Sequence, residues 1–147
     1  NNCDWYYTGS LSTDNTRWTT SSSSKSIYDP CPAGWRVPDG GDNGVWSTAL
    51  GSSSDFEDYI LYDSSNAGIN FSGRFGSAST IWYSASGCRY DYDGALNIVG
   101  YDGYYWSVTP NSDYAYGLHL NDLGNVEPTY SYYRASGYSV RCLQESE

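Results

Sequence analysis

The sequence contains no methionine, a single histidine and only seven basic residues among its 147. The formal net charge is −10, and the few Lys and Arg residues are mostly isolated, so no basic patch can neutralise several phosphates. This argues against nucleic acid as a partner and disfavours anionic membranes. No apolar run approaches the roughly 18 residues that a membrane-spanning helix needs, so we expect no direct membrane insertion. The start at Asn1 without methionine predicts a processed or excised piece.

Paired cysteine motifs are also missing. Cys3, Cys31, Cys88 and Cys142 show no CxxC spacing and have no histidine nearby, so we expect no zinc site, no other metal and no cofactor. The residues alone leave open two disulfides, or one disulfide and two free thiols. Any disulfide would indicate an oxidising, extracellular setting.

Aromatic residues offset the modest hydrophobic content. Hydrophobic residues make up 39% of the chain and aromatic residues 18%. Each aromatic side chain can bury roughly 150–250 Å², which is enough to build one core for a single domain over residues 1–147. The 16 glycines and the lack of long periodic apolar stretches favour a loop-rich β protein.

Tyrosine is concentrated in the second half of the chain, where eleven of the 17 follow position 88 among Asp, Ser, Asn and Gly. Tyr is rigid and offers both an apolar face and a hydroxyl, while Ser, Asn and Gly add adaptable polar contacts. Antibody binding loops use the same mixture. The residues that we expect to form an exposed ligand-binding patch are Tyr90, Asp91, Tyr92, Tyr101, Asp102, Asp113, Tyr114, His119, Asn121, Tyr130, Tyr132, Tyr133 and Tyr138.

Local patterns predict short elements. The segment DPCPAGWRVP (29–38) is constrained by three prolines, so we expect Trp35 and Val37 to be buried there. Residues 45–50 suit a first helix, and the S-x-x-E spacing at 54–57 predicts a second helix over 55–62. Strands are expected, together with a short one near 5–8, at 81–84, 95–99, 104–108, 114–120 and 139–143.

In the predicted strand 114–120, alternation places Tyr116, Leu118 and Leu120 on one face, which we expect to pack. Ala115, Gly117 and His119 share the other face, which we expect to be free to vary. His119 therefore reads as a surface residue. With one histidine, no nucleophile elbow and no phosphate loop, catalysis by His119 with Ser or Asp is a minor alternative, and we expect no enzyme.

Two further sites have competing interpretations. Asp39, Asp42 and Asn43 lie in a turn-rich stretch and could ligate calcium, but oxygen-rich turns are common. Glu127-Pro128 is followed by Thr129, and the chain has no Trp-Asn-Asp triplet of calcium-dependent lectins. We interpret Glu127-Pro128 as a turn.

Three motifs carry a family resemblance: DPCPAGWRVP (29–38), DGALNIVGYDGYYWSVTP (93–110) and RASGYSVRC (134–142). Together they resemble the Fibrobacter succinogenes major paralogous domain of Bacteroidetes surface proteins, over most of the chain and in the family's order. The resemblance implies an α+β protein with a C-type lectin-like fold: two short helices packed on a small twisted antiparallel sheet with long loops, and with paired N- and C-terminal segments. It also implies a disulfide between Cys31 and Cys142 and leaves a Cys3–Cys88 pair in doubt.

Some members of this family resemble the target proteins of diversity-generating retroelements, in which adenines are randomised. An AAC codon then becomes NNC, which can give Tyr, Asp, Ser, Asn, His, Gly, Leu, Arg or Cys but never Trp, Lys, Glu, Gln or Met. Between Cys88 and Tyr138, only Trp106 and Glu127 belong to the forbidden set. Residues 88–138 therefore match a variable region of such a protein.

Together these observations predict a non-catalytic receptor or adhesin domain whose C-terminal surface is diversified by a retroelement to bind protein or glycan ligands on another cell or surface. The expected location is extracellular, on a bacterial cell surface or a phage virion. The alternative is a carbohydrate-binding adhesin or lectin domain of fixed specificity, in which the same aromatic faces stack on sugar rings.

Overall fold

A computed structural model describes residues 4–6, 13–18, 25–51, 62–73 and 80–145. Within these ranges the structure is mixed, with most strands in small antiparallel sheets and very little helix, consistent with the α+β class. No helix among the described residues is long and apolar enough to cross a membrane. The elements in chain order are β1 (Trp35–Arg36), α1 (Val45–Leu50), β2 (Tyr62–Asp63), β3 (Gly68–Asn70), a 3₁₀ turn (Phe71–Gly73), β4 (Trp82–Ser84), β5 (Cys88–Arg89), β6 (Leu96–Asn97), β7 (Asp102–Asn111), β8 (Tyr114–Asn121), β9 (Val126–Tyr133) and β10 (Leu143–Gln144).

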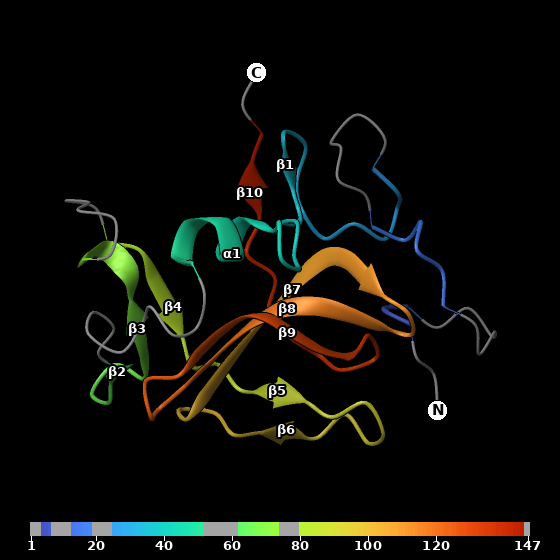
Figure 1. Cartoon of the computed structure of the whole chain (residues 1–147). Helices are drawn as coiled ribbons and strands as arrows, with labels where there is room; N and C mark the ends of the chain where they lie inside the picture. The colour runs from blue at the N-terminus through green and yellow to red at the C-terminus, as the bar shows by residue number, and fades with distance from the viewer. Residues whose placement is uncertain (1–3, 7–12, 19–24, 52–61, 74–79, 146–147) are drawn as a thin grey trace.

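The largest sheet is the antiparallel meander β7–β8–β9, which occupies the centre of the molecule in Figure 1. In that view α1 and the β1–β10 pair lie above this sheet, the β5–β6 hairpin lies below it, and the β2–β3–β4 sheet lies to one side. The pairing of β1 with β10 joins residues 35–36 to residues 143–144. The central sheet is thus covered on both faces.

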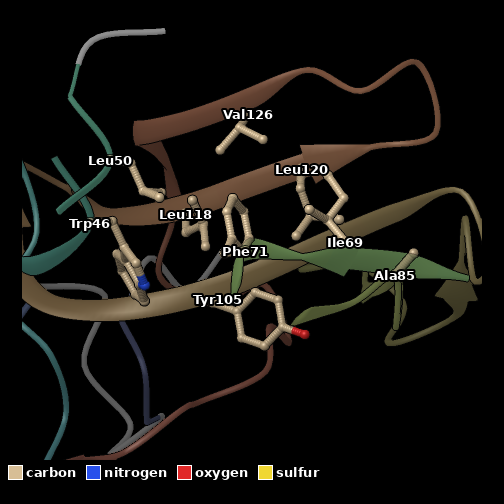
Figure 2. Packing of buried hydrophobic residues seen from close by; sticks show 9 residues of the cluster. All are labelled: Trp46, Leu50, Ile69, Phe71, Ala85, Tyr105, Leu118, Leu120 and Val126. Carbon is tan, nitrogen blue, oxygen red and sulfur yellow. The ribbon is translucent and has the colours of Figure 1, made fainter. Parts of the chain in front are cut away.

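The first core lies on one face of the central sheet, where Tyr105, Leu118, Leu120 and Val126 meet Trp46 and Leu50 of α1 together with Ile69, Phe71 and Ala85 (Figure 2). Trp46 and Leu50 are four residues apart and so lie on the same side of the helix. The helix ends at Gly51, whose φ of 83° is easily adopted by glycine. The predicted helix over 45–50 is confirmed.

The second core lies on the opposite face, because successive residues of a strand point to opposite sides. Trp106, next to Tyr105 in β7, packs with Val108, Ala115, Trp18, Val37 and Cys31. Both faces of β8 are therefore buried, with Ala115 fully buried and His119 only 7% exposed. The expectation that the Ala115–His119 face is free to vary, with His119 at the surface, is wrong.

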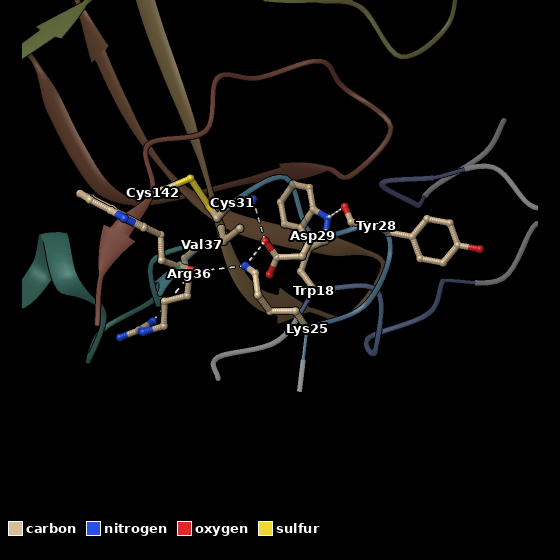
Figure 3. The surroundings of a disulfide bond; sticks show 9 residues. Trp18, Lys25, Tyr28, Asp29, Cys31, Arg36, Val37 and Cys142 are labelled. Carbon is tan, nitrogen blue, oxygen red and sulfur yellow. Dashed lines mark hydrogen bonds and ion pairs between the residues drawn. A yellow bond between two sulfur atoms is a disulfide. The ribbon is translucent and has the colours of Figure 1, made fainter. Parts of the chain in front are cut away.

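The predicted disulfide between Cys31 and Cys142 is present, with 5.7 Å between the two Cα atoms (Figure 3). The Asp29 carboxylate holds the neighbouring turn by accepting from the Cys31 amide at 2.8 Å and the Lys25 ammonium at 2.7 Å. Val37 is fully buried beside it, as expected, but Trp35 is 38% exposed. The expected burial of Trp35 is wrong, since β1 is a two-residue strand and Trp35 packs in neither of the two buried clusters.

Several predicted strands are found, with shifted bounds: 81–84 corresponds to β4, 95–99 to β6, 104–108 to β7 and 114–120 to β8. Of the predicted strand 139–143, only Leu143 lies in β10, and Ser139 instead forms an isolated parallel bridge with Tyr105. The second predicted helix lies outside the described residues except for Tyr62, which begins β2. Of the expected strand near 5–8, Trp5 and Tyr6 lie in a bend, and residues 7–8 lie outside the described residues.

The interpretation of Glu127-Pro128 as a turn is wrong, since both residues lie inside β9. β9 is an edge of the central sheet, where proline is tolerated because its missing N–H can face away from the partner strand. The β8–β9 register also shifts between Gly117 and His119, next to these residues. Pro128 is therefore the reason that the eight-residue strand β9 was not predicted.

Candidate ligand-binding face

Aromatic rings cover one side of the central sheet, and a second stacked pair, Tyr90 and Tyr92, lies on the neighbouring β5–β6 hairpin. We call these rings together the aromatic face. Its members come from β7, β8, β9, the segment that follows β9 and the turn of the β5–β6 hairpin: Tyr104, Trp106, His119, Tyr130, Tyr132, Tyr138, Tyr90 and Tyr92.

Strand register builds the inner part of this face. Tyr104 and His119 are direct cross-strand partners, and their rings stack with centroids 4.6 Å apart. Tyr138 then stacks on Tyr104 at 4.7 Å and on Trp106 at 4.3 Å. Tyr104, Trp106 and His119 are each less than 10% exposed. This inner tier is a packed support that presents little surface of its own.

Backbone bridges fix the position of the β5–β6 hairpin beside the inner tier. Gly87 forms a parallel bridge with Gly103 of β7, and Arg89 forms an antiparallel bridge with Gly137, next to Tyr138. The Arg89 amide donates to the Gly137 carbonyl at 2.8 Å, and the Gly137 amide donates back at 2.9 Å. The hairpin turn that carries Tyr90 and Tyr92 is thereby held next to residues 137–138.

The outer tier consists of the rings that solvent reaches. Tyr92 is 67% exposed and stacks on Tyr90, with ring centroids 5.0 Å apart. Tyr132 of β9 is 37% exposed and lies 6.1 Å from Tyr130 between ring centroids. The pKa of Tyr92 is raised, first by partial desolvation and then by the charges of nearby groups that include Asp93 and Tyr132. The contribution of Tyr132 is the smallest of these, after those of Asp93, Tyr90 and Asp91.

Hydrogen bonds hold the polar atoms of the inner tier except Nδ1 of His119, which is buried without a hydrogen-bond partner. The Tyr104 hydroxyl donates to Oδ2 of Asp102 at 2.8 Å, and Nε2 of His119 lies 2.9 Å from the same oxygen. The Trp106 indole donates to the Ser136 carbonyl at 3.0 Å. Burial, followed by the hydrogen bond and charge of Asp102, raises the pKa of Tyr104.

Burial also raises the pKa of Tyr138 and of Tyr130, so these hydroxyls stay neutral at physiological pH. Cys88, at the start of the hairpin, carries a buried free thiol whose pKa is raised by burial. Cys88 forms no disulfide, and Cys3 lies outside the described residues.

The structure brings together part of the residue set expected from the sequence. Asp102, His119, Tyr130, Tyr132 and Tyr138 meet at the aromatic face together with Tyr90, Asp91 and Tyr92 of the hairpin turn. Tyr101 is 59% exposed at the adjacent end of the sheet. Asn121 pairs with Asp102 there, and its side-chain oxygen accepts from the Leu123 and Asn125 amides of the following turn.

Tyr114 and Tyr133 are not brought to the aromatic face. They are cross-strand partners whose rings lie 4.7 Å apart, and alternation along β8 places Tyr114 on the side of Leu118 and Leu120. Asp113 is exposed in the β7–β8 turn, at the far end of the sheet from Asp102. Asp113 and Tyr114 therefore do not join the other members of the expected patch.

Three residues of this region were absent from the expected set of binding residues: Tyr104, Trp106 and Glu127. Tyr104 belongs to the face through the alternation Asp102, Tyr104, Trp106 along β7, and that signal is present in the sequence. Oε1 of Glu127 lies 3.5 Å from Nδ1 of His119. Glu127 was not expected at this face because Pro128 argued against a strand at this position.

Within the described part of the chain, no group of three or more His, Cys, Asp or Glu side chains is arranged to hold a metal ion. Of the calcium candidates, Asp39 instead forms an ion pair with Arg36 at 2.8 Å. Comparison of the chain with protein-family models, with curated proteins and with solved structures finds no match.

Proposed function

We propose that this chain is a non-catalytic ligand-binding domain of a receptor or adhesin on a bacterial cell surface or phage virion, and that the outer tier of the aromatic face contacts the ligand. The observation that carries the proposal is that the exposed rings of the outer tier lie beside the buried, hydrogen-bonded rings of the inner tier. Tyr92 and Tyr132 offer apolar ring surface and hydroxyls, while Tyr104, Tyr138 and Trp106 fix the platform beneath. A rigid aromatic platform lowers the entropic cost of binding.

A C-type lectin-like fold is part of the proposal. The features that support it are the pairing of β1 with β10, the disulfide that joins the same two regions, and a helix packed against an antiparallel sheet. The three motifs that resemble the Bacteroidetes surface-protein family supply the remaining support.

Diversification by a retroelement is the second part of the proposal. Residues 88–138 span β5 to β9 and supply all of the outer tier. Their composition matches the products of NNC codons at nearly every position. A near-identical template repeat beside a reverse transcriptase gene would support diversification, and its absence from the source genome would favour a fixed binding specificity.

A non-catalytic function is supported by the surroundings of the single histidine. Nε2 of His119 lies 2.9 Å from Asp102, and Nδ1 lies 3.5 Å from Glu127. Both ring nitrogens face carboxylates, so neither is directed at a hydroxyl that it could activate. A hydrolase would need such a nucleophile next to the base.

The alternative is a carbohydrate-binding adhesin domain of fixed specificity. It is favoured by one observation: Tyr92 and Tyr132 expose ring surface, and Asp91 and Asp93 lie close enough to raise the pKa of Tyr92. Exposed rings flanked by hydrogen-bonding carboxylates suit the stacking of a sugar ring.

Binding of a fluorescent, tetramerised domain to a glycan array and to a panel of intact bacterial cells tests the proposal. We expect the wild type to bind at least one of these targets. A Tyr92→Ser/Tyr132→Ser variant should lose about 30-fold or more in affinity, the effect of hot-spot aromatic residues, with little change in melting temperature. Ile27→Ser is the matched control, because Ile27 is 92% exposed and lies outside the face.

Equal binding by the wild type and the Tyr92→Ser/Tyr132→Ser variant would overturn the proposal, as would unfolding of that variant. Binding to glycans alone, with the same specificity in close relatives, would favour the fixed-specificity lectin. Binding to cell-surface protein would favour the receptor.

A further inference from the structure

One ring nitrogen of His119, at the centre of the aromatic face, is buried without a hydrogen-bond partner. A carboxylate only accepts hydrogen bonds, so the 2.9 Å contact with Asp102 places the proton of a neutral imidazole on Nε2. Nδ1 then carries a lone pair. It lies 3.5 Å from Oε1 of Glu127, which is a second acceptor, and it is buried with no hydrogen-bond partner. Two acceptors thus face each other without a donor.

Two kinds of donor can relieve this arrangement. A proton on Nδ1 converts His119 to an imidazolium that donates toward both Asp102 and Glu127. Alternatively, Glu127 turns to a cation outside the domain and no longer faces Nδ1. The Glu127 side chain is 51% exposed on the edge strand β9, so its carboxylate has access to solvent. The His119 side chain is only 9% exposed and stays fixed by Tyr104 and Asp102.

On the basis of the ligand-binding function proposed above, we propose that Glu127 anchors a cationic group of a protein ligand, a lysine ammonium or an arginine guanidinium, and that this cation competes with a proton on His119 for the Glu127 carboxylate. The ring of Tyr130, three positions along the same strand and 5.0 Å from the His119 ring between centroids, supplies aromatic surface to the aliphatic stem and the charge.

The surrounding charges fit a cationic ligand. Asp91 and Asp93 lie beside Tyr92 on the neighbouring hairpin, and the chain as a whole carries a net charge of −10. The hairpin also holds one cation, Arg89, whose guanidinium donates to the Gly94 carbonyl at 2.8 Å. The excess of acidic groups should attract basic partners and repel acidic ones.

Proton competition has a clear signature, because His119 is the only histidine in the sequence. Histidine is the side chain whose charge ordinarily changes between pH 5 and 8. The titratable groups that face it are Asp102 and Tyr104 on β7, and Glu127 and Tyr130 on β9, with Tyr138 and Cys88 packed behind them. Burial raises the pKa of Tyr104, Tyr130, Tyr138 and Cys88, so none of these four changes charge in that interval.

The test is a titration of the ¹⁵N-labelled domain with Nα-acetyl-lysine methylamide, followed by amide chemical shifts at pH 8.0 and pH 5.5. We expect saturable shifts at the amides of residues 127 and 129–132 and about fivefold tighter binding at pH 8.0, the size of one exposed ion pair. Nα-acetyl-norleucine methylamide lacks the charge, so it should bind at least about fivefold more weakly than the lysine probe at pH 8.0.

Two variants isolate the competing groups. Glu127→Gln should remove the advantage of lysine over norleucine at both pH values. His119→Gln keeps an N–H for Asp102 but does not titrate, so lysine binding should no longer depend on pH. If His119→Gln does not fold, Glu127→Gln still decides, because Glu127 is exposed.

Lysine binding that is absent, that equals norleucine binding, or that is independent of pH in the wild type would overturn this inference. Failure of the lysine probe would leave the proposed function standing as long as glycan or cell binding still depends on Tyr92 and Tyr132. If that binding is unaffected by the Tyr92→Ser/Tyr132→Ser variant, the proposed function itself fails.

Discussion

The guanidinium carbon of Arg134 lies 4.6 Å from the ring centroid of Trp5, on a segment 129 positions earlier in the sequence. Arg134 is 1% exposed. Its Nε donates to the Tyr114 carbonyl at 2.8 Å and its Nη2 to the Ser112 carbonyl at 2.7 Å. One buried cation therefore joins the N-terminal segment to the β7–β8 turn. Burial lowers its pKa, and the nearby charge of Asp4 opposes that shift.

Arg134→Lys should destabilise the domain although it retains the charge. A lysine ammonium cannot reproduce the planar fork that reaches both carbonyls and covers the indole, and it leaves buried acceptors without donors. We expect a loss of at least about 2 kcal/mol in the free energy of unfolding, measured with urea. Arg89→Lys, at an exposed site, should change stability by less than about 0.5 kcal/mol. Equal effects of the two changes would refute this role for Arg134.

Removal of the disulfide should be costly, because it closes a loop with a sequence separation of 111. A Cys31→Ser/Cys142→Ser variant should lose about 2–4 kcal/mol, mainly through the larger entropy of its unfolded state. Urea denaturation of the oxidised and reduced wild type should give the same difference. Cys88→Ser controls for the loss of a thiol alone, and it should leave the response to reductant unchanged.

Gly87 and Gly94 have the same φ of 70°, so alanine substitutions at these two positions distinguish backbone strain from steric clash. A Cβ at Gly87 would lie 2.2 Å from the Asn97 carbonyl oxygen, whereas at Gly94 nothing lies within 4 Å. Gly94→Ala should cost about 1–2 kcal/mol, the strain of a left-handed residue. Gly87→Ala should cost clearly more, because the β5–β6 hairpin must also shift. Equal losses of stability in thermal melts of the two variants would show that the β5–β6 hairpin shifts without a cost in free energy.

High pH should destabilise the domain through its buried tyrosines. Burial raises the pKa of Tyr104, Tyr105, Tyr130 and Tyr138. Unfolding restores an ordinary pKa near 10, so above about pH 10 the unfolded state loses protons that the folded state keeps, and stability falls as pH rises. Below pH 10 this contribution is fully present. Absorbance at 295 nm should rise in two steps, and the second step should coincide with the loss of the far-ultraviolet circular dichroism signal.

The two tiers of the aromatic face should respond differently to truncation. Tyr138→Ala removes a ring stacked on both Tyr104 and Trp106 and should cost roughly 3–5 kcal/mol. Tyr132→Ala, on an exposed edge, should cost less than about 1 kcal/mol. Urea denaturation of both variants provides the measurement. A large loss for Tyr132→Ala would mean that the outer ring is structural.

Local patterns predict much of this fold and fail where partners lie far apart in the chain. Short runs between turn residues located β7 and β8, and the helix expected over 45–50 is α1. β9 was missed because the sequence does not reveal that its proline lies on a sheet edge.

The exposure of candidate site residues was harder to predict than the strands that carry them. Burial of His119 depends on Asp102, 17 residues earlier, and on packing against Tyr104. Tyr114 and Tyr133 share the composition of the expected patch but lie on the opposite side of the sheet. Composition therefore identified the region of the candidate site, and strand register decided which members meet.

The covalent link between Cys31 and Cys142 also determines how the domain would bear a pulling force. Tension that enters ahead of residue 31 and leaves beyond residue 142 passes through the sulfur–sulfur bond, not through the chain between them. The strands β5 to β9 lie within the bypassed segment. While the disulfide is intact, a load carried along the backbone would not stretch the segment that carries Tyr92 and Tyr132.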